Sequence, residues 1–347
     1  MRFAIVGAGG IAGLRRAAIE ALEGASLAGA FDLDPGRAAA LAGGATAFPS
    51  LEALVGSPEV DAVVVCTPPD SHERIALAAL GAGKHVIVEK PMAPTVEACR
   101  RMEAAARAAG RTLTVGFNHR YFPAVKAVRA AILSGRLGDL SHVRGYAGHT
   151  GLSEFKAPWM YSKDVMGGGA LLDNGIHMID LVHHLMGPVT GVQGLTTDRS
   201  WGLDRVEDNG FALLRGAGGV VGSLGASWTE WKGYGFFVEA YGTRGMARAS
   251  YAPMMYSEVT MDRPGGARRR RRDLYPRLIL AEKLRGWQST ATQTFVEEMR
   301  DFAALATGGG PGGVVATAGD GVRSIEIAQG VYESAASGRM VELAPGP

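Results

Sequence analysis

Cysteine is scarce in this chain of 347 residues, which contains only Cys66 and Cys99. Two cysteines exclude a disulfide framework and a cysteine-based zinc site, and they fit a reducing compartment. A net charge of only +2 gives no global field that would attract nucleic acid or another acidic partner. No apolar run approaches the roughly 18 residues that a membrane span needs. We therefore expect a cytoplasmic protein that contacts neither nucleic acid nor a membrane.

The first residues, MRFAIVGAGGIAGLRR, superficially resemble a signal peptide, with one arginine before an apolar stretch. Glycines interrupt the middle of that stretch, however, and Arg15 and Arg16 follow without a convincing cleavage site. We expect this segment to belong to the folded protein. The chain is too long for one ordinary core, so two domains are expected.

Short apolar runs alternate with helical stretches through the first third of the chain. Continuous apolar strands separated by helices predict a parallel sheet covered on both faces, and right-handed crossovers make it doubly wound. The predicted strands lie at 3–6, 26–32, 61–66, 85–88 and 112–117.

The first predicted strand runs directly into the glycine-rich turn GAGGIA, which opens a helix. The backbone of Gly7, Gly9, Gly10 and Ile11 could hold a pyrophosphate at the positive end of that helix. Asp32, at the end of the second strand, could accept hydrogen bonds from ribose hydroxyls. The alternative is an ordinary turn with a solvated aspartate. We predict a dinucleotide-binding domain of the Rossmann type over residues 1–120.

The same acidic residue bears on the choice of cofactor. A carboxylate at Asp32 would repel a 2′-phosphate, which favours NAD over NADP. Arg37 follows a few residues later and could partly compensate that repulsion.

Ligands of an open α/β sheet bind beyond the carboxyl ends of its strands. Thr67 and Pro68 follow one predicted strand, and Glu89 and Lys90 follow the next. Lys90 could simply extend to solvent and pair with Glu89. At this position, however, its ammonium could also lie beside the nicotinamide and bind the oxygen of a reacting alcohol or carbonyl. His72 could line the same groove or cap its helix.

After Phe117 the alternation of strands and helices stops. Short apolar strands separated by glycine and polar turns predict an antiparallel sheet, so residues 121–347 should form an α+β domain. Within it, the stretch from Gly167 to Gly187 reads as a helix. Its Asp173, His177, Asp180 and His184 are spaced by 4, 3 and 4 residues, which places them on one helical face. A metal site and a structural polar stripe are two interpretations of that face.

Three motifs together resemble the Gfo/Idh/MocA oxidoreductase family, named for glucose–fructose oxidoreductase and inositol dehydrogenase. They are GAGGIA, CTPPDSHERIALAALGAGKHVIVEKPMA and GGGALLDNGIHMIDLVHHLMG, and similarity extends through 237–250 and 320–343. The resemblance implies that Lys90 is the lysine of the catalytic site, and it makes the Lys90–Pro91 peptide a candidate for the cis form. It also implies a homodimer or homotetramer formed through the open face of the C-terminal sheet.

The resemblance favours a third interpretation of the polar helix face, as an acid–base pair. His177 would take the hydroxyl proton, since its ordinary pKa of ~6.5 suits a base near neutral pH. Asp173 would orient the imidazole or hold a substrate hydroxyl, and Lys90 would complete the proton relay. Asp180 and His184 would be structural. No metal is expected. The glycines at 167–169 would let the chain approach the cofactor closely.

Several other residues have two interpretations. Asn118 could bind a substrate hydroxyl or the nicotinamide ribose, or simply form a turn, and Arg120 beside it is an alternative polar contact. Trp159 could wall the substrate pocket or pack in the core. The arginine run Arg268–Arg272 lacks interleaved aromatic residues, so we expect a solvated loop, with an inter-subunit contact as the alternative.

We therefore expect an NAD-dependent oxidoreductase that acts on a secondary alcohol, or the matching ketone, of a sugar, cyclitol or derivative. Two alternatives are kept. One is an enzyme that retains its NAD and cycles the hydride internally, as aldose–aldose oxidoreductases and NAD-dependent glycosidases of the resembled family do. The other is a non-catalytic dinucleotide sensor on the same scaffold.

Overall fold

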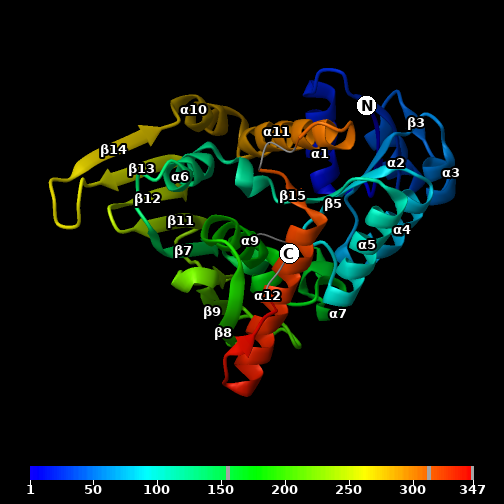
Figure 1. Cartoon of the computed structure of the whole chain (residues 1–347). Coiled ribbons are helices and arrows are strands. Elements are labelled where there is room, and N and C mark those ends of the chain that lie inside the picture. The colour runs from blue at the N-terminus through cyan, green and yellow to red at the C-terminus, as the bar shows by residue number, and fades with distance from the viewer. Residues whose placement is uncertain (154–156, 311–313, 345–347) are drawn as a thin grey trace. The chain divides into compact units, whose positions relative to one another are not determined.

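The structure is a computed structural model that describes residues 1–153, 157–310 and 314–344. The chain forms two compact units, each built from two stretches of sequence (Figure 1). The first unit comprises Met1–Tyr121 and Ala281–Val322, and the second comprises Phe122–Leu280 and Arg323–Pro347.

The first unit is built on a sheet whose strands are parallel except for β15 at one edge. Its central strands are apolar and buried along their length, as strands with both faces covered must be. In the order in which they lie, the strands are β15 (Ala316–Thr317), β6 (Leu113–Gly116), β5 (His85–Glu89), β4 (Ala62–Val65), β1 (Arg2–Val6), β2 (Ser26–Phe31) and β3 (Thr46–Ala47).

Helices connect these strands, as the alternating pattern predicts. They are α1 (Gly10–Ala21), α2 (Pro35–Ala42), α3 (Leu51–Gly56), α4 (His72–Gly81), α5 (Val96–Ala109) and, from the far end of the sequence, α11 (Gln288–Ala306). Short 3-10 helices η1 (Pro69–Ser71) and η2 (Asn118–Tyr121) follow β4 and β6. The sequence-based fold class of this half, a doubly wound parallel sheet, is confirmed.

The return of α11 to the first unit differs from the predicted division at 120/121, which gave every later residue to the second domain. Phe295, Met299 and Phe302 of α11 are buried in the same core as Phe3 of β1 and Ile19 of α1. Apolar area removed from water is the main favourable term in folding, so this packing assigns residues 281–322 to the first unit.

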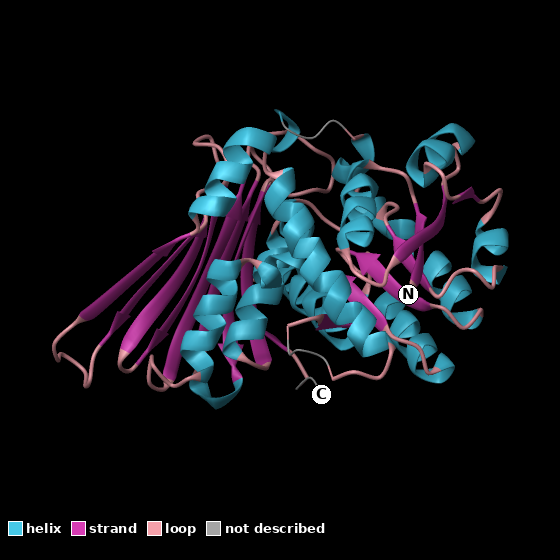
Figure 2. Cartoon of the chain, turned by 90° about the horizontal axis from the view of Figure 1, so that it is seen from above, coloured by secondary structure: helices cyan, strands magenta, loops and turns pink. Residues whose placement is uncertain are grey.

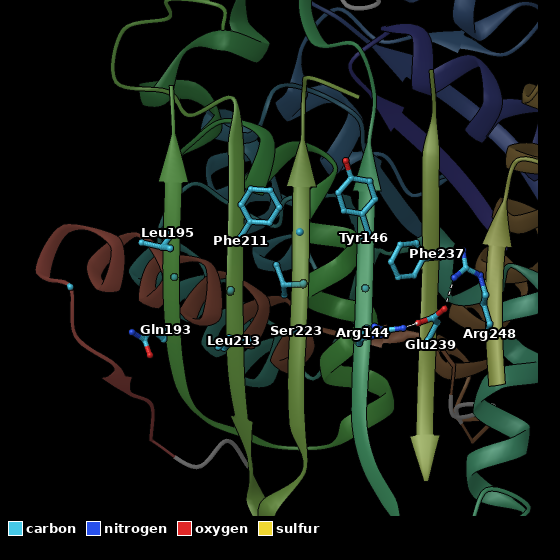
Figure 3. A pocket seen from close by; sticks show the side chains of 16 residues that line it. Arg144, Tyr146, Gln193, Leu195, Phe211, Leu213, Ser223, Phe237, Glu239 and Arg248 are labelled. Atoms are coloured by element: carbon cyan, nitrogen blue, oxygen red, sulfur yellow. Dashed lines mark hydrogen bonds and ion pairs between the residues drawn. The ribbon is translucent and has the colours of Figure 1, made fainter. Parts of the chain in front are cut away.

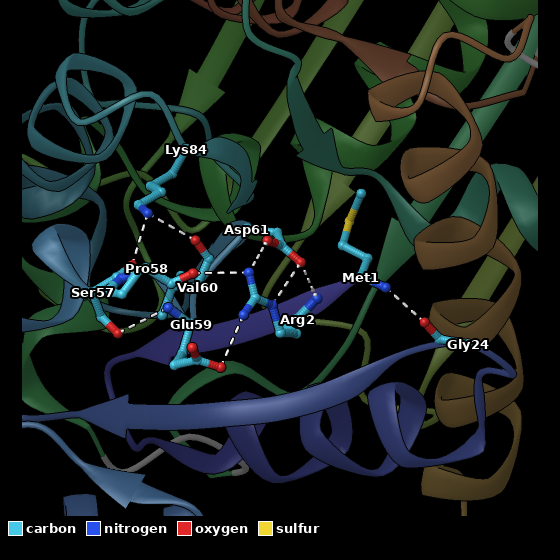
Figure 4. Close-up of polar contacts among 9 residues, drawn as sticks. All are labelled: Met1, Arg2, Gly24, Ser57, Pro58, Glu59, Val60, Asp61 and Lys84. Atoms are coloured by element: carbon cyan, nitrogen blue, oxygen red, sulfur yellow. Dashed lines mark hydrogen bonds and ion pairs between the residues drawn. The ribbon is translucent and has the colours of Figure 1, made fainter.

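The amino end of the first sheet is closed by polar contacts near its surface (Figure 4). The backbone N–H and the guanidinium of Arg2 both donate to the carboxylate of Asp61, and Arg2 also pairs with Glu59 at 2.9 Å. Lys84 donates to the carbonyls of Ser57 and Val60. These contacts fix the amino end of β1 beside that of β4. Ligands of such sheets bind at the opposite, carboxyl ends of the strands.

The second unit contains a larger sheet that is antiparallel except where β7 pairs with β10. The strands lie side by side in Figure 2. In spatial order they are β14 (Arg269–Leu274), β13 (Met255–Thr260), β12 (Gly245–Tyr251), β11 (Gly235–Gly242), β7 (Leu140–Gly148), β10 (Val221–Ser227), β9 (Asn209–Gly216), β8 (Val189–Thr197) and β16 (Val341–Glu342). The predicted α+β class of this half is also confirmed.

Helices cover one face of this second sheet. Besides the helices already given with the first sheet, the chain contains α6 (Pro123–Leu133), α7 (Lys163–Met166), α8 (Ala170–Asp173), α9 (Gly175–Met186), α10 (Pro276–Arg285) and α12 (Ala318–Ser337). The 3-10 helices η3 (Gly151–Ser153), η4 (Pro158–Tyr161) and η5 (Ala217–Gly219) lie in connections. α9 packs on β7 and β10, and α6 packs on β12 and β13.

The opposite face of the second sheet carries no helix in the described part of the chain, and we call it the open face. Along β9, exposed side chains alternate with buried ones, as a one-sided sheet requires, and Figure 3 shows the side chains that line this face. Leu195, Phe211 and Leu213 are exposed, and they line a hollow of about 600 Å³ that also contains Arg144, Glu239 and Arg248.

The arginine run corrects a prediction. Residues 269–272 do not form a loop but lie in β14, an edge strand paired with β13. Arg271 pairs with Asp273, and its guanidinium lies 5.8 Å from the ring centre of Tyr256. Composition pointed to a solvated loop because the pairing with β13 cannot be seen in the run itself. Positive charge on an edge strand discourages pairing with other chains, which explains why such a run is tolerated there.

Within the described ranges, none of the helices has the length and apolarity that a membrane crossing requires. The same residues contain no group of three or more His, Cys, Asp or Glu side chains arranged to hold a metal ion.

Candidate active site

The glycine turn between β1 and α1 combines a tight contact with an open space. Gly7 has a φ of +92°, and a Cβ there would lie 2.8 Å from the backbone nitrogen of Thr67. A Cβ at Gly9 or Gly10 would meet no protein atom within 4 Å. Gly9 caps α1 without a side-chain hydrogen bond, and the first turn of the helix carries no acidic residue. The exposed N–H groups and the helix dipole therefore fit a pyrophosphate.

Asp32 lies beside this turn and is held in place by the chain itself. Its Oδ2 accepts from the N–H of Ala8 at 2.7 Å, and its Oδ1 accepts from the N–H of Asp34 at 2.9 Å. Arg37 Nη2 lies 3.2 Å from the same carboxylate. The two residues predicted to select the cofactor are thus brought together. A carboxylate next to a helix N-terminus fits the ribose of NAD, as the sequence predicts.

Lys90 follows β5 directly at the carboxyl end of the first sheet, and its side chain is partly buried. The Lys90–Pro91 peptide is cis, as the family resemblance suggested. Thr67 and Pro68 follow β4, which is the neighbour of β5. The carboxyl ends of adjacent parallel strands meet at one edge, so these predicted residues share the edge where ligands of such folds bind.

The side chain of His72 is bound within the first unit, and its predicted contact with the cofactor stays a prediction. It is fully buried, its Nε2 lies 2.7 Å from the carbonyl of Thr67, and its Nδ1 lies 3.1 Å from that of Pro91. Burial lowers the pKa of its imidazole. Both ring nitrogens face backbone carbonyls, so His72 joins the loops after β4 and β5.

His119 belongs to this edge, and the sequence analysis did not select it. It lies in η2, directly after β6, and its pKa is lowered to about 3 by burial and by the nearby ammonium of Lys90. The imidazole therefore stays neutral at physiological pH. The available signal was its place after a predicted strand, which it shares with Asn118.

The neighbours of His119 are engaged within the first unit. Asn118 Nδ2 donates to Thr294 Oγ1 of α11 at 3.0 Å, and its role toward a ligand stays a prediction. The guanidinium of Arg120 is buried, donates to the carbonyls of Val314 and Val315, and pairs with Asp320 at 3.2 Å. These contacts hold Arg120 within the first unit, and its part as a substrate contact stays a prediction.

In the second unit, the stretch predicted as one polar helix is divided at Asn174 into α8 and α9. The Asn174 amide donates to the carbonyl of Ala147 at 3.0 Å and to that of Ser227 at 3.3 Å, which anchors the break to β7 and β10. Asp173 and His177 lie on either side of it, with 5% and 7% of their surface exposed. Asp180 is also buried.

Two residues that sequence reasoning missed hold Asp173. Trp228 Nε1 donates to Asp173 Oδ2 at 3.0 Å, and His149 Nε2 lies 2.9 Å from the same oxygen. The N–H of Gly151 donates to His149 Nδ1, so the ring proton is on Nε2 and the neutral imidazole donates to the carboxylate. Tyr161 packs edge-on against Trp228, and burial near Asp173 raises its pKa to about 12. No local motif marks His149 or Trp228, since both are distant from Asp173 in sequence.

The glycine run before α8 is shaped by the protein's own contacts, and its close approach to the cofactor stays a prediction. A Cβ on Gly169 would lie 2.1 Å from the carbonyl oxygen of Glu207. The buried Glu207 carboxylate accepts from the N–H groups of Gly169 and Leu171, each at 2.9 Å, and from the hydroxyl of Tyr332. Glu207 thus caps the start of α8 from another segment and fixes the helix that carries Asp173.

Trp159 lies in η4 with 38% of its surface exposed. It is therefore not a core residue, and its part in walling a substrate pocket remains a prediction.

Two family models match the chain. The model described as an oxidoreductase family with an NAD-binding Rossmann fold matches residues 1–117, and that of the GFO/IDH/MocA C-terminal domain matches residues 125–248.

Named relatives agree with these matches. Inositol 2-dehydrogenase of Rhizobium meliloti (strain 1021) is 28% identical over 352 residues, which cover 99% of each chain. Inositol 2-dehydrogenase of Acidothermus cellulolyticus is 32% identical over 267 residues, which cover 74% of each. A solved levoglucosan dehydrogenase in complex with NADH and L-sorbose is 25% identical, with 99% of each chain covered and a TM-score of 0.85.

Proposed function

The chain belongs to the Gfo/Idh/MocA oxidoreductase family, and from that premise we propose that it is a dehydrogenase acting on a secondary alcohol of a sugar, cyclitol or related polyol. One observation carries this proposal. The chain has both Lys90 after β5 and the buried Asp173 and His177 around the break between α8 and α9. Polyol-oxidising relatives support the substrate class.

The turn after β1 and the carboxylate of Asp32 would hold NAD, which supplies the hydride acceptor of the reaction. In this proposal, Lys90 donates a hydrogen bond to the oxygen of the reacting alcohol or carbonyl. A compact ammonium with rotatable donors suits that task, since it follows the charge that develops on the oxygen.

His177 would take the hydroxyl proton in the oxidative direction and return it in the reductive one. An imidazole can both accept and donate a proton, which suits both directions of the reaction. The carboxylate of Asp173, held by Trp228 and His149, would orient the imidazole or a substrate hydroxyl. Both residues are almost fully buried, which strengthens their interactions with a developing charge.

The test is spectrophotometric measurement of NADH with a panel of inositols, pyranoses and anhydrosugars. We expect His177→Ala to lower kcat by a factor of about 10² or more, while NAD binding measured by calorimetry changes little. His184→Ala, two turns along α9, is the matched control and should retain activity. Normal turnover by the His177 variant would contradict the assignment of the base.

Lys90 and His177 are assigned to one chemical step, and a double-mutant cycle tests this. If they act on the same proton transfer, the effects of Lys90→Met and His177→Ala on kcat will be strongly non-additive. Fully additive losses would show that the residues act on separate steps.

We also infer that the open face forms a homodimer or homotetramer interface. Leu195, Leu213 and Phe211 expose 69%, 54% and 46% of their surface there, and contiguous apolar patches on one sheet face are typical of subunit contacts. Leu213→Asp should lower the oligomeric state in sedimentation experiments. An unchanged sedimentation coefficient would argue against this face.

Cys66 and Cys99 are both buried thiols, which supports a reducing, cytoplasmic compartment.

A further inference from the structure

A buried ion cluster lies at the carboxyl end of β5, immediately before Lys90. Arg15 of α1 donates from Nε to Glu89 Oε1 at 2.6 Å and from Nη1 to Glu298 Oε2 of α11 at 2.6 Å. Arg15 and Glu298 are wholly inaccessible to solvent, and Glu89 exposes 9% of its surface. We call these three residues the Arg15 cluster. It joins α1, which bears the glycine turn, to the strand that bears Lys90.

The cluster has little room to move. The guanidinium of Arg15 stacks 4.1 Å from the ring centre of Phe295. Gly116 of β6 also lies close to the guanidinium, since a Cβ there would come within 2.5 Å of Arg15 Nη2 and 3.1 Å of Glu89 Oε2. Because the carboxylate of Glu89 is confined in this way, the backbone from which Lys90 begins is confined with it.

The charges of the cluster do not balance. One guanidinium faces two carboxylates, and Arg15 Nη2 and Glu298 Oε1 are buried without a hydrogen-bond partner. Apolar side chains of similar volume often stabilise a core as well as a buried ion cluster does. Stability alone therefore does not explain these residues, and their place beside Lys90 points to the active site.

We propose that Arg15 and Glu298 are positioning residues for Lys90: Arg15 fixes the carboxylate of Glu89, and Glu298 modulates that hold by binding or releasing a proton. When Glu298 is ionised, the guanidinium is shared between two carboxylates. When Glu298 is protonated, the charge of Arg15 acts on Glu89 alone. This inference rests on the proposed function only in its assumption that Lys90 takes part in catalysis.

The electrostatics place this proton exchange near neutral pH. Burial raises the pKa of Glu298 to about 7, the positive charge of Arg15 opposes that rise, and the charge of Glu89 adds to it. Arg120 also lowers the pKa of Glu298. The other titratable groups of the surroundings are Cys66, whose buried thiol has a raised pKa, and Tyr121, whose pKa is raised by burial and by the charges of Glu298 and Asp301.

The first test needs no substrate. The folded protein binds a proton at Glu298 that the unfolded chain releases above the ordinary pKa of 4.5, so stability from this group is lost as pH rises through about 7. Thermal melting of Glu298→Gln should lack this loss. The difference in melting temperature, wild type minus variant, should fall between about pH 5 and 8. Glu20→Gln removes an exposed ion pair with Arg16 on the same helix and is the control, with no such trend expected.

The second test uses the pH dependence of turnover. We expect the kcat of the wild-type enzyme to decrease partly as pH rises through about 7. The Glu298→Gln variant should not show this decrease, and its KM for NAD should stay unchanged. In the Arg15→Lys variant, one ammonium cannot bind both carboxylates as the guanidinium does. The variant should therefore have a kcat about tenfold lower at every pH, and its KM for NAD should change less than about twofold. A merely structural role would change stability without altering the pH profile.

The outcomes distinguish a failure of the positioning role of the Arg15 cluster from a failure of the proposed dehydrogenase function. Identical pH trends in melting and turnover for wild type and Glu298→Gln would overturn the proposal. If Glu298→Gln does not fold, Arg15→Lys decides: kcat at the wild-type level would overturn it. If wild-type protein oxidises no polyol, the proposed function fails, whereas the melting comparison still reports whether Glu298 exchanges a proton near neutral pH.

Discussion

Glu89 in the first unit and Asp173 in the second are both buried carboxylates next to a residue assigned to catalysis, but opposite kinds of donor hold them. Glu89 is held by the charged guanidinium of Arg15, which a second carboxylate shares. Asp173 is held by the neutral N–H groups of Trp228 and His149. The difference teaches that one chain can fix its buried carboxylates either by a guanidinium shared between two acids or by the N–H groups of two aromatic rings.

Removing the donors of each carboxylate should lower the free energy of unfolding by different amounts. A buried charge that loses its oppositely charged partner is destabilised more than a buried carboxylate that loses one hydrogen-bond donor and keeps a second. We therefore expect a larger loss of stability on substituting Arg15 in the first unit than on substituting Trp228 in the second. Substitution of an ion pair at the surface should cause a negligible loss.

The largest effect is expected for Arg15→Met. The substitution removes the guanidinium that the buried Glu89 and Glu298 share, which should lower the free energy of unfolding by about 3–5 kcal/mol. Urea denaturation monitored by circular dichroism measures this loss. Wild-type stability in the variant would show that the two carboxylates accept protons at no cost, and the comparison would then break down.

A smaller effect is expected for Trp228→Phe. Asp173 loses one N–H donor but retains His149, so the free energy of unfolding should fall by about 1.5–3 kcal/mol. Turnover should fall as well, because Asp173 is then less firmly oriented. The same urea titration and an NADH assay test this, and a loss exceeding that of Arg15→Met would reverse the ranking.

The smallest effect is expected for Glu59→Gln at the amino end of the first sheet. This carboxylate is largely exposed and pairs with Arg2, which also keeps Asp61. Exposed ion pairs are screened by water and salt, so the melting temperature should not change measurably. A clear decrease would mean that this edge contributes to stability as the buried clusters do.

Much of the first unit could be predicted because its signals are local. The glycine turn, Asp32 and Lys90 each follow a short apolar strand, and the periodicity that marks a strand also marks its end. Local spacing likewise placed Asp173 and His177 in a helical segment, although the break at Asn174 was missed because its amide bonds to strands that are distant in sequence.

The residues that were missed or misassigned depend on contacts between distant segments. Glu298 meets Arg15 across 283 positions, and Trp228 meets Asp173 across 55. The ion pair of Arg120 with Asp320 likewise spans 200 positions of sequence. The arginine run read as a loop because its strand is defined by pairing with β13. No periodicity within a window of ten or twenty residues contains this information.

The return of α11 to the first unit has a consequence for the order in which the protein can be made. A ribosome that has synthesised residues 1–121 has produced every parallel strand of the first sheet, but not Phe295, Met299 or Phe302, which complete its core. Arg15 at that moment also lacks Glu298. The nucleotide-binding half must therefore remain incomplete while strands β7 to β14 of the second sheet are synthesised, and a nascent chain stalled in between exposes an apolar surface that chaperones would have to shield.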